Sequence, residues 1–123
     1  MNARKLILVI DDSATIREGV RGALAEKGYE VLTAQDPVQG LMIARDKQPQ
    51  LIVLDIQMPG GGGSTLYERL KSLDLTSQIA VVLYSALTPI EIEQMTMLPP
   101  EATLVSKTEG FQSLAERIHQ LLG

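Results

Sequence analysis

The sequence contains no cysteine, a single histidine and no apolar run long enough to cross a membrane. Without cysteine, a disulfide framework, a thiolate metal site and a cysteine nucleophile are all excluded. The apolar stretches at 6–10 and 79–87 fall far short of the ~20 residues of a membrane helix. The first of them ends on Asp11 and Asp12, not on a small-residue cleavage site, so it is not a signal peptide. We therefore expect a soluble, cytoplasmic protein with no membrane contact.

A cluster of basic residues is also missing. The chain has 11 Lys and Arg against 15 Asp and Glu, a net charge of −4, which argues against direct nucleic-acid binding. Its 123 residues suit one domain, residues 1–123, and 45% hydrophobic with 21% charged residues is a globular composition. His119, the only histidine, is expected to be a solvated surface residue.

Short apolar runs alternate with helical patterns along the chain. The runs predict strands at 6–10, 29–34, 51–54, 79–84 and 103–106. The helices are expected at about 14–27, from 37 to just before 49, from 64 or 65 onward, at 90–97 and at 111–122. Ser13 and the pair Asp36-Pro37 have the residue types of helix starts. This alternation predicts an α/β fold, a doubly wound five-stranded parallel sheet with five helices.

Two glycines lie inside the first predicted helix. Gly19 and Gly22 each weaken a helix by roughly 1 kcal/mol relative to alanine. Close packing of another element against the helix would account for both.

Polar residues follow the apolar runs at the points where the strands end. These are Asp11 and Asp12, Asp55, Ser85 and Lys107. Asp55 alone could be a structural cap or the mouth of a site. In parallel sheets ligands bind outside the carboxyl ends of the strands, which favours a site.

Three carboxylates at one edge of the sheet would repel one another unless a cation lies among them. Oxygen-only ligands favour a hard ion, with Mg²⁺ as the first choice. A carboxylate can attack phosphorus, and the aspartyl phosphate then needs surrounding positive charge and hydroxyl donors. On this hypothesis Asp11 and Asp12 hold the metal, Asp55 is the nucleophile, and Lys107 and Ser85 bind the phosphoryl oxygens.

Together these residues resemble the receiver domain of two-component response regulators, of the single-domain chemotaxis type. The resemblance rests on Asp11-Asp12, Asp55 with Met58-Pro59-Gly60, Ser85-Ala86 and Lys107. It implies a flavodoxin-like fold with strand order 2-1-3-4-5. It also implies that Asp55 is phosphorylated by a histidine kinase or a histidine phosphotransfer protein, with Mg²⁺ as the cofactor. The implied metal ligands are Asp12, Asp11 partly through water, Asp55 and the backbone carbonyl of Gln57. Gly63 matches the glycine that the family places before its third helix.

Three departures from the family pattern are visible. The aromatic residue of the family's switch is replaced by Leu104, and the proline that usually follows the lysine is replaced by Thr108. A cis peptide without proline costs about 3 kcal/mol. The bond after Lys107 is therefore trans with the lysine placed differently, or it stores strain. Residues 60–63 are all glycine, which predicts a mobile loop beside Asp55.

We interpret the chain as a signalling module that is switched by phosphorylation, and not as an enzyme beyond catalysing its own phosphorylation and dephosphorylation. A downstream protein would bind the face formed by 90–97, 103–106 and 111–122, and homodimer formation stays open. The alternative is a protein-interaction domain of the same fold that does not cycle phosphate, supported by Leu104 and Thr108. A phosphohydrolase would need an acid or base just after Asp55, and Gln57 cannot ionise. A flavodoxin is disfavoured because the acids would repel the phosphate of a flavin cofactor.

Overall fold

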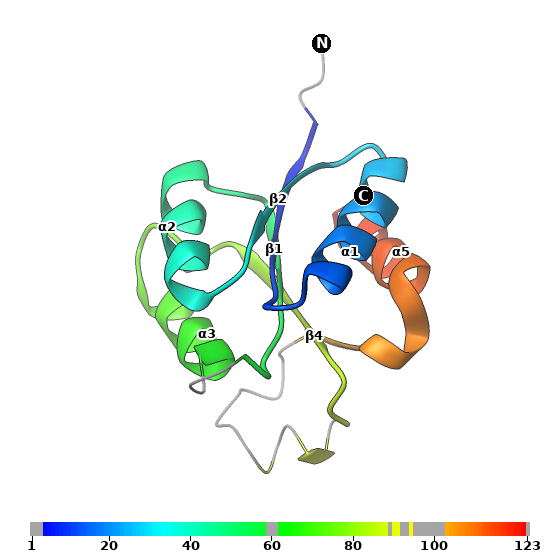
Figure 1. Ribbon diagram of the computed structural model, residues 1–123. Coiled ribbons are helices and arrows are strands. Elements are labelled where there is room, and N and C mark those ends of the chain that lie inside the picture. The colour runs from blue at the N-terminus through cyan, green and yellow to red at the C-terminus, as the bar shows by residue number, and fades with distance from the viewer. Residues whose placement is uncertain (1–3, 59–61, 89, 92–93, 95–102, 123) are drawn as a thin grey trace.

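The computed structural model describes residues 4–58, 62–88, 90–91, 94 and 103–122, and Figure 1 shows its elements. One sheet holds five parallel strands in the order β2-β1-β3-β4-β5, which confirms the predicted topology. The strands are β1 (Leu6–Ile10), β2 (Glu30–Ala34), β3 (Leu51–Leu54), β4 (Ala80–Ser85) and β5 (Thr103–Ser106). The α-helices are α1 (Ala14–Glu26), α2 (Pro37–Lys47), α3 (Gly62–Ser72) and α5 (Gly110–Leu122). The described residues thus form four α-helices where five were expected. The remaining predicted helix, 90–97, lies largely outside these residues.

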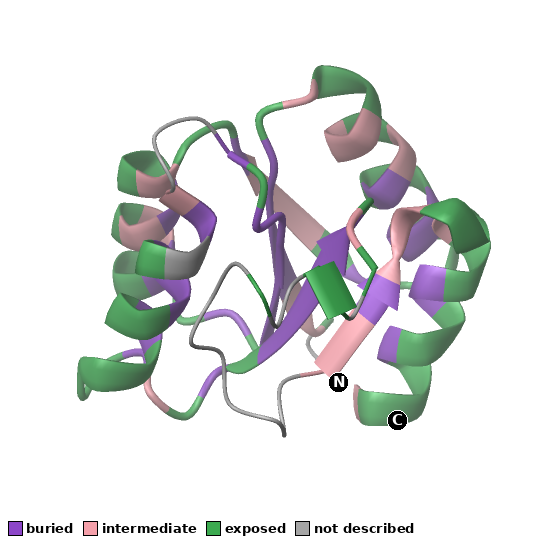
Figure 2. Cartoon of the chain, turned by 90° about the horizontal axis from the view of Figure 1, so that it is seen from below, coloured by how far each residue is buried: buried purple, intermediate pink, exposed green. Residues whose placement is uncertain are grey.

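The helices cover both faces of the sheet. Figure 1 shows α2 and α3 on one face and α1 and α5 on the other. Leu8 and Ile10 of β1 belong to the core under α2 and α3, whereas Ile7 and Val9 belong to the core under α1 and α5. Because successive side chains of a strand point to opposite faces, a strand buried on both faces needs apolar residues throughout. Figure 2 shows buried strands enclosed by helices with exposed outer surfaces.

The starts of α1 and α2 agree with the sequence signals. Ser13 Oγ accepts a hydrogen bond from the Ile16 N–H at 3.3 Å, and Asp36 Oδ1 accepts one from the Gln39 N–H at 2.8 Å. The α3 boundary differs, because the helix begins at Gly62, before the expected Ser64 or Thr65. In the described part of the chain no helix has the length and apolar character needed to span a membrane.

The glycines of α1 have different surroundings. A Cβ atom at Gly19 would lie 2.2 Å from the Phe111 ring, so α5 packs directly onto the backbone of α1. A Cβ atom at Gly22 would meet no atom within 4 Å. The prediction of close packing is confirmed for Gly19 and wrong for Gly22, which lies on the exposed side of the helix.

Candidate functional site

Two acidic residues extend β1 and β3 beyond their last apolar residue. The Asp11 N–H donates to the Ala34 carbonyl at 3.1 Å, and the Asp55 N–H donates to the Ile10 carbonyl at 3.0 Å. These bonds continue the sheet ladder and fix both residues at its carboxyl edge. Asp11 is 2% exposed and Asp55 is 3% exposed.

Asp12 completes a cluster of three carboxylates. One ligand oxygen from each of Asp11, Asp12 and Asp55 lies within 4.8 Å of the others. Asp12 is exposed to solvent, so the cluster is open on one side. The structure therefore brings together the three acids that the sequence placed at one edge of the sheet.

Lys107 supplies the positive charge at this cluster. Its Nζ atom lies 2.8 Å from Asp11 Oδ2 and 3.3 Å from Asp55 Oδ2, and its side chain is 18% exposed. One ammonium group therefore bridges two buried carboxylates, which partly offsets their mutual repulsion.

The Lys107–Thr108 peptide bond is trans, since the described residues contain no cis peptide. A short 3-10 helix, η2 (Lys107–Glu109), follows β5 and is capped by Ser106. The Thr108 N–H, which a proline would lack, donates to Ser106 Oγ at 3.2 Å. The sequence left two alternatives, a trans bond with the lysine placed differently or a strained bond. The bond is trans, and Lys107 still reaches Asp11 and Asp55. The capped turn explains how it does so without a proline.

Local hydrogen bonds hold the carboxyl groups in place. Asp55 Oδ1 accepts from the Gln57 N–H at 2.9 Å, and Asp11 Oδ1 accepts from the Ser13 N–H at 2.9 Å. Burial raises the pKa of the Asp55 carboxyl above its ordinary value. The negative charge of Asp11 acts in the same direction, whereas the Gln57 N–H and Lys107 oppose it and favour the charged form.

Ser85 lies at the carboxyl end of β4 and is fully buried. Its Oγ atom accepts a hydrogen bond from the Leu87 N–H at 3.1 Å. Among the described residues it makes no hydrogen bond to the acids. The hydroxyl thus lies at the predicted edge of the sheet, and its hydrogen bond is to the backbone two residues further along the chain.

Gly63 lies where α3 passes the backbone next to Asp55. A Cβ atom at this position would be 2.4 Å from the Asp55 carbonyl oxygen and from Ile56 Cα. No side chain fits there, which explains the glycine at this position in the first turn of α3. Residues 60 and 61 of the glycine-rich loop lie outside the described residues. The predicted mobility of the loop therefore stays a prediction.

The family model of the response regulator receiver domain matches residues 7–119. The chain belongs to this family. It is a receiver domain of two-component signalling systems, as the motifs and the fold indicated.

Similar proteins agree with this assignment. The chain is 42% identical over 82 residues to the phosphate regulon transcriptional regulatory protein PhoB of Pseudomonas aeruginosa, covering 67% of this chain and 36% of PhoB. It is 33% identical over 121 residues to the transcription regulator BvgA of Bordetella pertussis, covering 94% of this chain and 52% of BvgA. The chain therefore spans about half or less of these curated relatives. A CheY-like receiver domain protein from Methanospirillum hungatei superposes with a TM-score of 0.84 at 25% identity, covering 98% of this chain and 94% of that one.

Tyr84 is an aromatic residue of the site that was not expected from the sequence. Tyr84 directly precedes Ser85 and is 1% exposed, and its ring centroid lies 6.0 Å from Lys107 Nζ. Its hydroxyl is buried without a hydrogen-bond partner in the described part of the chain. Burial raises the pKa of this phenol, and the negative charges of Asp11 and Glu109 add to the effect. In the sequence an aromatic residue inside the apolar run 79–84 is typical of an ordinary core residue, so no signal pointed to this placement.

Arg17 is a second residue that was not anticipated. Its Nη1 atom donates to the Asp11 carbonyl at 2.8 Å, which ties α1 to the end of β1. An arginine one turn inside a helix gives no signal in the sequence that would distinguish this role from a surface charge.

Leu104 is the residue that the resemblance matches to the aromatic residue of the family's switch. It is half-buried in β5, pairs with Leu83 in the sheet and packs against the core under α2 and α3. His119 is exposed as expected, but Nδ1 of its ring lies 3.1 Å from the Tyr29 hydroxyl. It is remote in sequence from the acidic cluster and makes no bond to it in the described residues.

Proposed function

We propose that Asp55 is the phosphoacceptor of this receiver domain. A carboxylate oxygen of Asp55 attacks the phosphorus of a phosphohistidine on a histidine kinase or histidine phosphotransfer protein. The new O–P bond forms as the N–P bond breaks, and the imidazole leaves with the electron pair and takes up a proton. The observation that carries this proposal is the convergence of three carboxylates and one ammonium group at the carboxyl edge of the sheet.

The donor set fits a hard divalent cation. Mg²⁺ binds oxygen ligands at 2.0–2.1 Å, so opposite ligands lie about 4.2 Å apart. One oxygen of each acid lies within 4.8 Å of the others, so the three carboxylates could share one such ion. We propose Asp11, Asp12, Asp55 and the Gln57 backbone carbonyl as the residues that hold it. Bound there, the ion would neutralise charge on the phosphoryl oxygens.

Lys107 and Ser85 serve the phosphoryl group in this proposal. Lys107 Nζ already lies 3.3 Å from an Asp55 oxygen, so it reaches an oxygen of a phosphate formed there. Ser85 would donate its O–H to a phosphoryl oxygen while its Oγ still accepts from the Leu87 N–H. A shift of Oγ toward the phosphoryl group would then move the loop after β4 and link Asp55 to the protein-binding face.

We infer that residues 1–123 act as one receiver domain in the cytoplasm and that a downstream protein binds the face that includes β5 and α5. The net charge of −4 and the absence of cysteine support these inferences, and the charge also disfavours direct contact with nucleic acid. The domain would catalyse only its own phosphorylation and dephosphorylation.

One observation favours the alternative, an interaction domain that does not cycle phosphate. Leu104 packs against the core under α2 and α3 and offers no ring or phenol to couple with Ser85. Thr108, the other residue behind this alternative, gives it no support, because Lys107 reaches the acids beside a trans peptide.

The proposal is tested by intact mass spectrometry after incubation with acetyl phosphate, with and without Mg²⁺. We expect one phosphoryl adduct that requires Mg²⁺ and is absent in Asp55→Asn. A known receiver domain labelled in parallel is the positive control. No adduct under those conditions would favour the interaction domain that does not cycle phosphate.

A further inference from the structure

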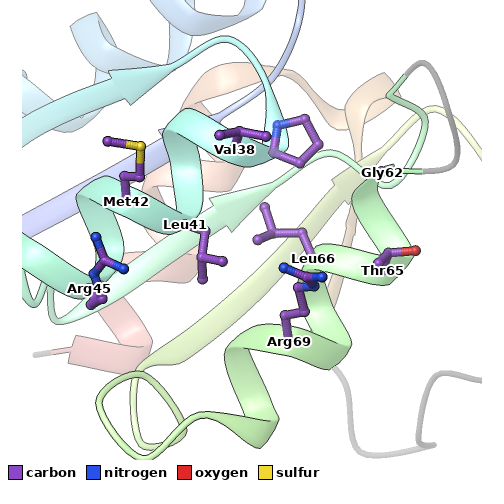
Figure 3. A pocket seen from close by; sticks show the side chains of 9 residues that line it. Val38, Leu41, Met42, Arg45, Gly62, Thr65, Leu66 and Arg69 are labelled. Atoms are coloured by element: carbon purple, nitrogen blue, oxygen red, sulfur yellow. The ribbon is translucent and has the colours of Figure 1, made fainter.

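A groove of about 360 Å³ runs between α2 and α3, on the face of the sheet opposite α1 and α5. Figure 3 shows it from close by, with Leu41 and Leu66 between the two helices. Its apolar lining includes Pro37, Val38, Leu41, Met42 and Leu66. The acidic cluster is not part of this lining.

The apolar residues that α2 contributes to the groove are not all needed for packing in the core. Gly40 and Ala44 bury the inner side of α2, and a Cβ atom at Gly40 would lie 2.6 Å from Ile10. Val38 and Met42 line the groove and are not part of this buried side; they are 71% and 51% exposed. These two residues are four apart and lie on one face of the helix. An apolar stripe on a helix is normally buried against another element.

Positive charge lies beside this apolar surface. Arg45 on α2 and Arg69 on α3 both line the groove (Figure 3). In the part of the chain that is described, the Arg69 side chain has no ion-pair partner, and Arg45 contacts only its neighbour Asp46 at 3.3 Å. Arg45 and Asp46 are both more than half exposed, and such pairs contribute little. Two arginines available at an apolar groove contrast with a chain of net charge −4.

We propose that the groove binds an amphipathic helix of another protein, with apolar side chains one turn apart and carboxylates at its edges. The apolar side chains would cover Val38 and Met42, as in the helix-in-groove mode of recognition. Arginine pairs with carboxylates through two parallel hydrogen bonds, so Arg45 and Arg69 would fix the register of the helix. This surface is separate from the face at β5 and α5, and its binding does not depend on phosphorylation of Asp55.

A second copy of the chain fits this groove poorly. In a two-fold symmetric contact the same patch meets itself. Arg45 and Arg69 would then face the arginines of the other copy, and like charges opposed across an interface are unfavourable. The charge of the groove therefore favours an acidic partner.

The proposal is tested by selecting from a displayed library of random 16-residue peptides against the full chain. The enriched peptides are expected to carry apolar residues three or four apart together with Asp or Glu. The affinity of an enriched peptide is then measured by fluorescence anisotropy. The double variant Arg45→Glu/Arg69→Glu should lose at least about tenfold in affinity, since both paired arginines become carboxylates that repel the acidic side chains of the peptide. The matched control Arg21→Glu/Arg117→Glu, with the same charge change on α1 and α5, should bind like the wild type.

A second measurement locates the peptide independently of the variants. Methyl NMR spectra with the bound peptide should show shifts at Val38, Leu41 and Met42 and none on the α1 and α5 side. The proposal is overturned if no peptide is enriched, if enriched peptides lack acidic residues, or if both double variants bind equally. It is also overturned if sedimentation shows a dimer of the chain that the groove variant abolishes, because the occupant would then be a second copy.

Discussion

Replacing Asp55 by asparagine should stabilise the protein when no divalent cation is present. The carboxylate is 3% exposed, and several kcal/mol are lost when an ion is taken out of water. Asparagine has nearly the same shape and can still accept the hydrogen bond from the Gln57 N–H. The substitution therefore removes a buried charge and keeps the local geometry.

The charges around Asp55 nearly balance. One oxygen of Asp11 and one of Asp55 lie within 4.8 Å of each other, which corresponds to at least about 3.5 kcal/mol of repulsion at an effective dielectric constant of about 20. Lys107 at 3.3 Å corresponds to about 5 kcal/mol of attraction on the same scale. Asp12 adds repulsion that solvent screens. Because these interactions largely cancel, the cost of burying the Asp55 charge determines the effect of the substitution. We expect Asp55→Asn to increase the free energy of unfolding by about 2 kcal/mol.

The gain should depend on pH in a defined direction. The pKa of Asp55 is raised in the folded protein, so the folded state binds its proton more readily than the unfolded state. The charge of Asp55 therefore lowers the stability of the wild type fully above the folded pKa, and this penalty declines as pH falls from the folded pKa to the unfolded pKa. The advantage of Asp55→Asn should be full at pH 7 and should shrink as the solution is acidified towards the unfolded pKa.

The assay is urea unfolding followed by circular dichroism, in EDTA, at pH 7 and at two lower pH values. Asp36→Asn is the matched control, because Asp36 is an exposed helix cap and asparagine caps equally well. It should leave stability within about 0.5 kcal/mol of the wild type. A destabilised Asp55→Asn at pH 7, or an advantage that grows on acidification, would refute this reasoning.

Three further outcomes are expected. Gly19→Ala should destabilise the protein by about 1–3 kcal/mol relative to Gly22→Ala, because only the Cβ atom at position 19 collides with the Phe111 ring. Urea unfolding of the two variants measures the difference, and equal stabilities would contradict the packing of α5 on Gly19. Tyr84→Phe removes a buried hydroxyl without a partner in the described residues, so thermal unfolding should show unchanged or higher stability, by up to about 1 kcal/mol, and a clear loss would reveal an unrecognised bond. Lys107→Met should slow labelling by acetyl phosphate about 100-fold while far-UV circular dichroism stays unchanged, and a wild-type rate would remove the lysine from the site.

The sheet could be predicted from the sequence because its strands are buried on both faces. Such strands leave continuous aliphatic runs, as in Leu51–Leu54, and the first polar residue after each run marks the carboxyl edge. That edge contains Asp11 and Asp55, so the meeting of these two acids followed from topology alone.

Other features depend on contacts between distant residues and left no local signal. Gly19 and Gly22 look alike in the sequence, but only Gly19 lies under Phe111, a residue of another helix. The placement of Lys107 differs from these cases, because it depends on a local turn in which Ser106 and Glu109 form a capping box, and this sequence signal was not used. Tyr84 was overlooked because an aromatic residue inside an apolar strand is an ordinary core residue by pattern.

The most direct test of the account is to locate the phosphoryl group on the chain. After incubation with acetyl phosphate and Mg²⁺, the acyl phosphate is reduced with borohydride, and the digested protein is sequenced by tandem mass spectrometry. The account predicts modification at Asp55 and at no other carboxylate, with none when Mg²⁺ is withheld. Modification at Asp11 or Asp12, or labelling that is independent of Mg²⁺, would contradict it.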